Sequence, residues 1–223
     1  MKFKNLLSAL ALTVLAGGLT VCATEITPEG QRLAETLDSM HVERLWLAGH
    51  QVNWRTGEPT GKAFADKAGH THCSAFAAAA AEKLGIYLLH PPEHSATLLA
   101  NAQEDWLRSS GAMQGWHAVV SPIQARELAN EGELVIVICK NPDKTRPGHV
   151  AIVRPSLWSD QKVLLEGPEI TQAGLINHTS TSTKEGFKNH PGAFENGQLM
   201  YFAHAISWSK LEQLDTAADR SAQ

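Results

Sequence analysis

The positions of apolar residues change along the chain, from helical spacing in the first half to short continuous runs in the second. After Thr27-Pro28-Glu29, the apolar residues Leu33, Leu37 and Met40 recur at intervals of three and four, which is the spacing of one helix face. A hydroxyl side chain, a proline and an acid in succession are typical of the first turn of a helix. The sequence therefore predicts a helix that starts at residue 28.

The segment 73–84 shows the strongest helix signal. It contains five consecutive alanines, and alanine has the highest helix propensity of all residues. Gly85 follows directly and is the residue type that most often ends a helix. Two further helices are predicted over residues 95–107 and 122–129, each with an apolar stripe or a Ser-Pro start.

Short apolar runs in the second half predict β-strands. Each run is four to eight residues long and is bounded by turn-forming residues such as Gly, Pro and Asn, as is typical of strands. The predicted strands cover residues 133–139, 149–153, 163–166 and 199–206.

Helices come before strands along the chain instead of alternating with them, which predicts the α+β fold class. Residues 57–69 and 179–197 are rich in Gly and polar residues and are expected to be loops. The polar residues after Leu214 are expected to fray. Since no linker or internal repeat interrupts the sequence, residues 24–215 are expected to form one domain, with 216–223 as a polar tail.

The N-terminus has the pattern of a secretory signal peptide. Lys2 and Lys4 precede the apolar run 6–15, and the fairly small residues at 21–23 provide a cleavage site after Ala23. The apolar run is too short to span a bilayer comfortably, so a short membrane anchor is the less favoured alternative. The sequence thus predicts that residues 1–23 direct export and are removed.

Residues 19–22 also resemble a degraded lipoprotein signal that ends in Cys22. Val21 is bulky at the position where Gly or Ala usually precedes the lipidated cysteine. Lipidation would tether the protein to a membrane surface without a spanning helix. We therefore expect a periplasmic or secreted protein with no stable membrane span, and keep the lipoprotein as the alternative.

Composition and charge narrow the class of protein. With 43% hydrophobic and 19% charged residues, a chain of 223 residues can bury a core, which excludes a globally disordered protein. The formal net charge of −4 comes without a basic stripe. Nucleic-acid binding needs Lys and Arg gathered on one face, so we expect no nucleic-acid partner.

Cys73 and Cys139 remain once a signal peptide is removed, and their settings differ. Cys139 closes the apolar run 134–138, which is typical of a buried strand and of a packing role. Cys73 follows a polar turn that contains His70 and His72. An exported protein could join the two cysteines, but their settings favour a packing thiol and a chemically active one, and we expect both to stay free.

Cys73 opens the alanine-rich helix, where unpaired backbone N–H groups and the helix dipole favour an anion. This position is expected to lower the pKa of the thiol, and the thiolate is the nucleophilic form of cysteine. His149 stands between Gly148 and the apolar residues 150–153, which places an imidazole at the exposed end of a strand, where it can act as a general base. The structural alternatives are an inert cysteine at a helix end and a histidine that caps a strand.

A cysteine that opens a helix, followed later by the sequence Gly-His-Val-Ala-Ile-Val at 148–153, resembles the NlpC and CHAP families of papain-like cysteine hydrolases. The segment 131–136 also resembles the hairpin of these families, and the resemblance covers roughly residues 65–175. It implies a papain-like core, with the nucleophile helix packed on an antiparallel sheet. It also implies that Cys73 and His149 hydrolyse amide bonds, very often in the stem peptides of peptidoglycan.

The resemblance further implies a polar residue on the strand after the His149 strand, which orients the imidazole. Glu166, at the end of the predicted strand 163–166, is the first candidate, because its carboxylate could accept the second ring N–H. Gln172 is the alternative. The backbone N–H of Cys73 would help to stabilise the tetrahedral oxyanion.

His72 and Trp116 are candidate substrate-binding residues. His72 directly precedes the nucleophile, and Trp116 follows Gly115, so both could line the cleft. A turn residue and a core indole are the equally simple interpretations.

Two other functions fit the same residues. His70, His72, Cys73 and His149 are zinc-ligand types that would suit a zinc-dependent amidase, although they lack the spacing of a structural zinc site. A non-catalytic module that binds cell-wall peptides would need no thiolate. We therefore expect a cysteine amidase or endopeptidase without metal or cofactor, with peptidoglycan or another peptide as substrate. An inhibitor or immunity protein is a further expected partner if the enzyme attacks competitors.

Overall fold

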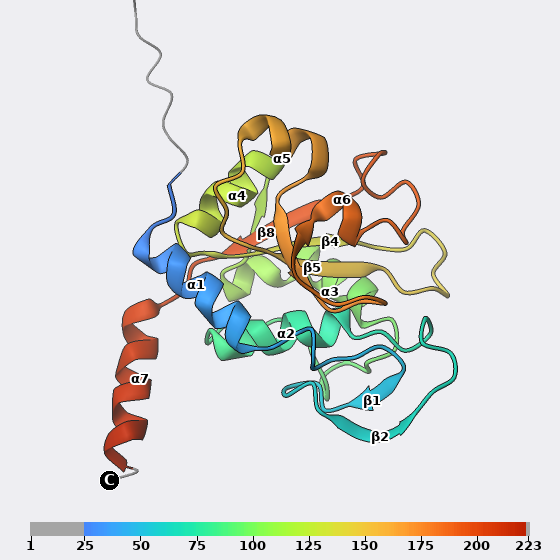
Figure 1. Ribbon diagram of the computed structural model, residues 1–223, viewed down its shortest axis with the longest axis horizontal. Helices are drawn as coiled ribbons and strands as arrows, with labels where there is room; N and C mark the ends of the chain where they lie inside the picture. Colours follow the sequence, from blue (N-terminus) through green and yellow to red (C-terminus); the bar gives the residue numbers. More distant parts are fainter. Residues whose placement is uncertain (1–24, 222–223) are drawn as a thin grey trace, which may run out of the picture.

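The computed structural model describes residues 25–221, which form a mixed α+β structure (Figure 1). In this part of the chain, seven α-helices surround an antiparallel sheet of six strands. The predicted α+β class is therefore confirmed. The signal peptide predicted at residues 1–23 lies outside the described residues. None of the helices between residues 25 and 221 is long and apolar enough to cross a bilayer.

The helices cover both faces and one end of the sheet. They are α1 (Pro28–Ser39), α2 (Cys73–Lys83), α3 (Leu99–Ser109), α4 (Pro122–Asn130), α5 (Asp160–Glu166), α6 (Thr183–Gly186) and α7 (Trp208–Ser221), with a 3₁₀ turn at Gly111–Gln114.

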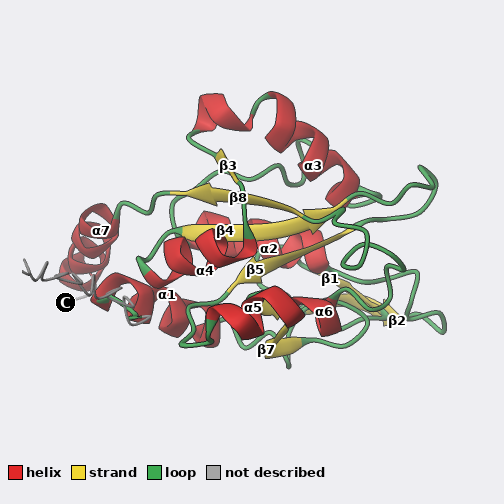
Figure 2. Cartoon of the chain, turned by 90° about the horizontal axis from the view of Figure 1, so that it is seen from above, coloured by secondary structure: helices red, strands yellow, loops and turns green. Residues whose placement is uncertain are grey.

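The six strands lie in the order β3-β8-β4-β5-β6-β7, and every neighbouring pair is antiparallel (Figure 2). A separate hairpin of two strands, β1 and β2, lies beside the N-terminal end of α2. The strands are β1 (His50–Val52), β2 (Pro59–Ala63), β3 (His117–Val119), β4 (Leu134–Cys139), β5 (His149–Val153), β6 (Glu169–Gln172), β7 (His178–Ser182) and β8 (Met200–His204).

The central strands β4 and β5 are buried along their whole length. Alternate side chains of a strand point to opposite faces of the sheet, and each face carries its own apolar core. One core joins Leu134 and Ile136 to α2. The other joins Val135 and Val137 to α4. The continuous apolar run of β4 thus reflects a strand covered on both faces.

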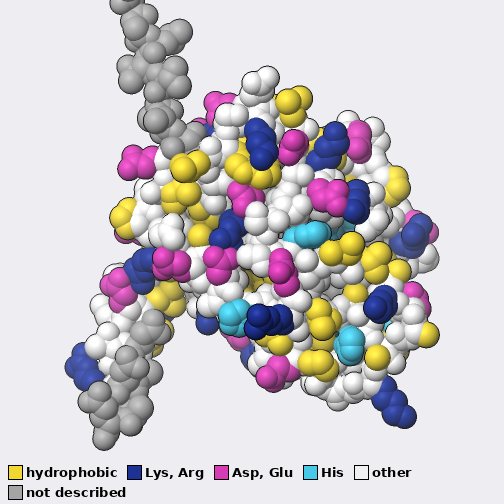
Figure 3. Space-filling view, viewed as in Figure 1, with side chains coloured by type: hydrophobic (Ala, Val, Ile, Leu, Met, Phe, Trp, Pro, Cys, Tyr) yellow, Lys and Arg dark blue, Asp and Glu magenta, His cyan; other side chains and the backbone are white. Residues whose placement is uncertain are grey.

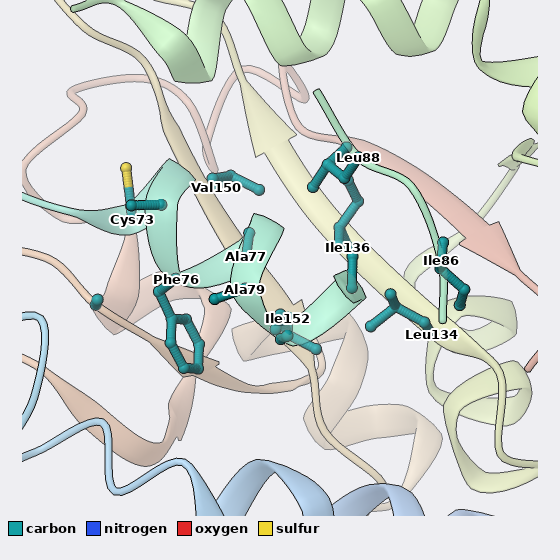
Figure 4. Close-up of a cluster of buried hydrophobic side chains, with 14 of the residues drawn as sticks. Cys73, Phe76, Ala77, Ala79, Ile86, Leu88, Leu134, Ile136, Val150 and Ile152 are labelled. Carbon is teal, nitrogen blue, oxygen red and sulfur yellow. The ribbon is translucent and has the colours of Figure 1, made fainter. Parts of the chain in front are cut away.

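Helix α2 forms where the alanine-rich segment predicts it, and it lies against β5 (Figure 4). Its small side chains allow close approach: Ala77 and Ala80 have no exposed surface. Phe76 fills the remaining space against Trp46, with ring centroids 5.3 Å apart. The helix ends before Gly85, which adopts φ = +71°, a conformation that favours glycine. The predicted stop is confirmed.

Two other predicted helix starts are confirmed by their caps. The Thr27 side chain accepts a hydrogen bond from the Gly30 backbone N–H, and Ser121 accepts one from Gln124. Each cap is followed by proline at the first turn, as the sequence pattern indicates. The predicted helix over 95–107 begins later than expected, at Leu99.

The predicted strand over residues 163–166 is wrong, because this segment belongs to helix α5. The Ser159 side chain caps the helix by accepting a hydrogen bond from the Lys162 N–H. Only Val163 is buried, whereas Leu164 and Leu165 are more than 60% exposed. A short apolar run therefore marks one helical turn here, and the strand that follows β5 is β6.

Three segments expected to be irregular contain regular structure. The segment 57–69 contains β2, and 179–197 contains most of β7 and all of α6. The expected fraying after Leu214 is also wrong, since α7 continues to Ser221. Helix α7 is tied to the domain at its first turn, where the Trp208 indole donates to the Gly132 carbonyl at 3.1 Å.

Candidate active site

Cys73 is the first residue of α2, as predicted, and its side chain is 5% exposed. Its sulfur projects from the start of the helix near Val150 of β5 (Figure 4). The thiol is in hydrogen-bond contact with the Val150 backbone N–H. Val150 directly follows His149, so the fold brings the two predicted catalytic segments together.

The contact between Cys73 and Val150 forms where β6 separates from β5. The N–H groups of alternate residues in a strand point the same way, and Arg154 N–H donates to the Glu169 carbonyl of β6. The Val150 N–H therefore also points toward β6. However, the paired residues nearest this end are Ile152 and Thr171, so the Val150 N–H is left for the thiol. Sγ thus lies at the edge of β5, against the backbone of the residue that follows His149.

His149 begins β5 and is 5% exposed. Its Nε2 lies 2.7 Å from the Gln172 Oε1. The Gln172 amide is oriented by its own Nε2, which donates to the Ile176 carbonyl, so the amide oxygen faces the imidazole. Because this oxygen can only accept, the ring proton is on Nε2 and Nδ1 carries the lone pair. Nδ1 has no hydrogen-bond partner among residues 25–221 and is free to act as a base.

Gln172, and not Glu166, holds the imidazole in this structure. Gln172 is the last residue of β6 and is 4% exposed. Glu166 ends helix α5 and makes no hydrogen bond or ion pair with His149 or with any other described residue. The expectation that Glu166 reaches His149 from a neighbouring strand is therefore wrong, because the segment that contains Glu166 is a helix. Gln172, the alternative in the sequence, takes that position.

Two further side chains enclose the His149 ring and were not identified from the sequence. Phe187 contacts it edge-on, with centroids 4.7 Å apart, and His190 stacks on it at 5.1 Å and an interplanar angle of 13°. Both follow α6, in the segment that sequence patterns assign to a loop. The polar sequence around them does not indicate a contact with His149, because this contact arises only in the tertiary fold.

The loop before His149 is held by the side chain of Asn101 on α3, which is 6% exposed. Its Oδ1 accepts the backbone N–H groups of Asn141 and Gly148, and its Nδ2 donates to the Arg146 carbonyl. Gly148 has no room for a side chain, since a Cβ there would lie 2.1 Å from the Cys139 carbonyl oxygen. The glycine before the histidine is therefore required by close packing.

Burial sets the protonation states of the candidate pair. It lowers the pKa of His149 to about 4, although the Gln172 hydrogen bond opposes the shift. It raises the pKa of the Cys73 thiol, and the N–H groups of Val150, Ser74 and Cys73 itself only partly offset this. The expectation that the helix start lowers this pKa is corrected, because desolvation outweighs the N–H groups. At neutral pH the free protein therefore holds a neutral thiol at Cys73 and a neutral imidazole at His149.

These pKa shifts predict how alkylation of Cys73 depends on pH. Since the thiolate is the reactive form and the pKa of the thiol is raised, the rate of alkylation by iodoacetamide should keep rising with pH through neutrality. Mass spectrometry of the Cys73 peptide between pH 5 and 10 measures this rate. A rate that is already constant from about pH 5 upward would contradict the neutral pair and indicate a thiolate–imidazolium pair.

A hollow of about 480 Å³ opens beside His149. His149 and Gln172 line it, as does Thr71 from the turn before α2. Cys73 is not part of the lining. The space is large enough for a few peptide residues and reaches His149.

The two predicted substrate-binding residues have structural contacts instead. The His72 Nε2 bonds the His50 carbonyl at 2.8 Å, which ties the turn before α2 to β1. Trp116 is 2% exposed and donates its indole N–H to the Tyr87 carbonyl. Neither lines the hollow beside His149. Both residues therefore hold backbone segments in place, at His50 and at Tyr87. His70, the other histidine of the turn before α2, stacks on Phe64 with ring centroids 3.7 Å apart.

Among the described residues, the histidines near Cys73 do not form a metal site. Within residues 25–221, no group of three or more His, Cys, Asp or Glu side chains is arranged to hold a metal ion. Cys73 and Cys139 are both free.

Comparisons with known proteins give no family assignment for this chain. A scan against protein-family models finds no match. A search of curated proteins finds no similar sequence either.

Proposed function

We propose that this protein is a cysteine hydrolase of amide bonds with a papain-like catalytic arrangement. The proposal rests on one observation: a buried histidine has Nε2 held by Gln172 and Nδ1 free, one residue from the thiol contact at the start of α2. A nucleophile, a base and a group that orients the base are the three parts of a covalent acyl-transfer site. The packing of α2 on an antiparallel sheet supports the papain-like core implied by the sequence.

The arrangement suits general-base catalysis from a neutral pair. As a substrate carbonyl binds, the Cys73 S–H proton passes to His149 Nδ1 while Sγ forms a bond to the carbonyl carbon. The resulting oxyanion lies near the start of α2, where the Cys73 backbone N–H can donate to it. Collapse breaks the C–N bond, and the leaving amine takes the proton from His149. A thioester remains on Cys73.

Deacylation uses the same base. His149 Nδ1 takes a proton from water as the water oxygen attacks the thioester carbon. Sγ then leaves, takes back the proton, and the carboxylic acid product is released. Gln172 keeps the Nε2 proton in place through both half-reactions, so Nδ1 is always the atom that exchanges protons.

Peptidoglycan stem peptides are the proposed substrate. Support comes from the resemblance to NlpC and CHAP enzymes and from the export signal that the sequence predicts in residues 1–23, since an exported bacterial hydrolase meets the cell wall first. In this proposal the enzyme works in the periplasm or outside the cell. No cofactor is needed for either half-reaction.

Mass spectrometry of purified muropeptides tests the proposal. Incubation with the protein should give products whose masses differ by one water from the cleaved parent, and these masses name the bond. Iodoacetamide should abolish the products, whereas a chelator should leave them unchanged. Loss of activity to the chelator, with recovery on adding zinc, would support the zinc-dependent amidase instead.

A further inference from the structure

Arg146 carries a cation in the hollow that has no partner in the described part of the chain. It stands on the loop between β4 and β5 and lines the 480 Å³ hollow beside His149. It also lines an adjoining hollow of about 270 Å³. Among residues 25–221, its guanidinium makes no hydrogen bond and no ion pair with any acid. Its charge is close enough to His190 to contribute to the lowered pKa of that residue.

Arg146 is exposed, but its backbone is held by two hydrogen bonds. Its N–H donates to the Asp143 carbonyl at 3.0 Å, and its carbonyl accepts from the buried Asn101 side chain at 2.9 Å. Asn101 also holds Gly148, the residue before the base. One buried amide therefore sets the positions of both His149 and Arg146.

The other charged groups around the larger hollow neutralise each other. Lys188 forms an ion pair with Glu185, and both line this hollow. Asp143 lines only the smaller hollow, where its carboxylate accepts hydrogen bonds from the Thr145 N–H and hydroxyl. Among the described residues that line the larger hollow, the Arg146 guanidinium is thus the one charged group without an ion-pair partner. The hydrogen bonds from Thr145 lower the pKa of Asp143 and the Arg146 charge adds to this shift, but the Asp143 and Arg146 side chains form no ion pair. The guanidinium therefore keeps a fork of N–H donors that matches a carboxylate.

We propose that Arg146 binds a free carboxylate of the substrate close to the scissile amide. The substrate class would then be acidic peptides, with a preference for a free carboxyl group over its amidated form. This inference rests on the proposed amide hydrolysis, because it assigns the hollow to the substrate. It adds to the proposed hydrolysis a determinant of substrate specificity.

Binding to the inactive Cys73→Ala variant tests this without turnover. The probes are synthetic peptidoglycan stem tetrapeptides, one with every carboxyl group free and a series with a single carboxyl group amidated. Calorimetry should show that one amidation weakens binding by about tenfold or more, the usual effect of losing a charged hydrogen bond. Adding Arg146→Gln should weaken binding of the free peptide by the same factor as the amidation does. The double variant should then bind the free and the amidated peptide with equal affinity. With Arg146→Lys in place of Arg146→Gln, part of the preference for the free peptide should remain.

Lys144→Gln is the matched control, since Lys144 is an exposed cation on the same loop but lines neither hollow. It should leave the preference unchanged. The inference is overturned if Arg146→Gln keeps the ratio of affinities for free and amidated peptides, or if no tetrapeptide binds. Hydrolysis by the wild type is scored separately: cleavage without an Arg146-dependent preference overturns this inference alone. A preference without cleavage overturns the hydrolase and leaves the carboxylate site.

Discussion

Replacing Cys73 with alanine should abolish amide hydrolysis, with kcat lowered by about 10⁴-fold or more, because no thioester can form. The fold should survive the change. Alanine suits the first turn of α2 and fits the space of the thiol, so the expected loss of unfolding free energy is only about 1 kcal/mol. Turnover of muropeptides and thermal unfolding of the same preparation measure the two effects.

Cys139→Ala is the matched control for Cys73→Ala. Cys139 is also a buried thiol, it pairs in register with His149, and burial raises its pKa to about 12. Its replacement should cost a similar amount of stability and keep activity within about threefold, since a packing thiol contributes only contacts. Activity that survives Cys73→Ala, or that is lost only with Cys139→Ala, would remove Cys73 from the mechanism.

The parts of the fold that follow from local preference were predicted from the sequence. Helix α2 needs only the propensity of its alanines and the stop at Gly85, and α1 and α4 need only their caps and prolines. Strands β4 and β5 follow from apolar runs that are buried on both faces. In each case one strong local signal agrees with the tertiary environment.

Prediction failed where a short segment carries two compatible patterns. Residues 163–166 are apolar enough for a strand, but Ser159 supplies a cap four residues earlier and the segment forms α5. Strand β6 mixes polar and apolar residues, and Gln172 at its end is buried by its contacts with His149, Ile176 and Gly186 in other segments. Pairing between strands is a tertiary property, so the choice between Glu166 and Gln172 could not be made from local sequence.

The candidate site divides in the same way. Cys73 and His149 have strong local signals, a helix start and a glycine before an apolar strand. Asn101, His190 and Arg146 act across the fold: a buried amide on α3 holds a loop 40 or more residues away. Such residues are recognised by their contacts, and polar residues in a loop give no comparable pattern.

Gln172→Ala should lower kcat by about 10²-fold or more, whereas Glu166→Gln should leave it within about twofold. The reason is geometric: the 2.7 Å hydrogen bond from Nε2 to Gln172 fixes the tautomer in which Nδ1 is the base. Without it, the buried ring can rotate or place its proton on the wrong nitrogen. Steady-state kinetics on one defined muropeptide measures both variants.

The pH profile separates an orienting role for Gln172 from simple packing. The pKa of His149 is lowered to about 4, so the neutral base is present above that pH and is lost as the pH falls through it. Gln172→Glu would put a carboxylate on Nε2, favour the imidazolium and raise this pKa. The acid limb of kcat/KM should then move to higher pH, while Glu166→Gln should not move it. An acid limb that shifts with Glu166→Gln and stays fixed with Gln172→Glu would return the orienting role to Glu166, because only the group that touches the imidazole can change its titration.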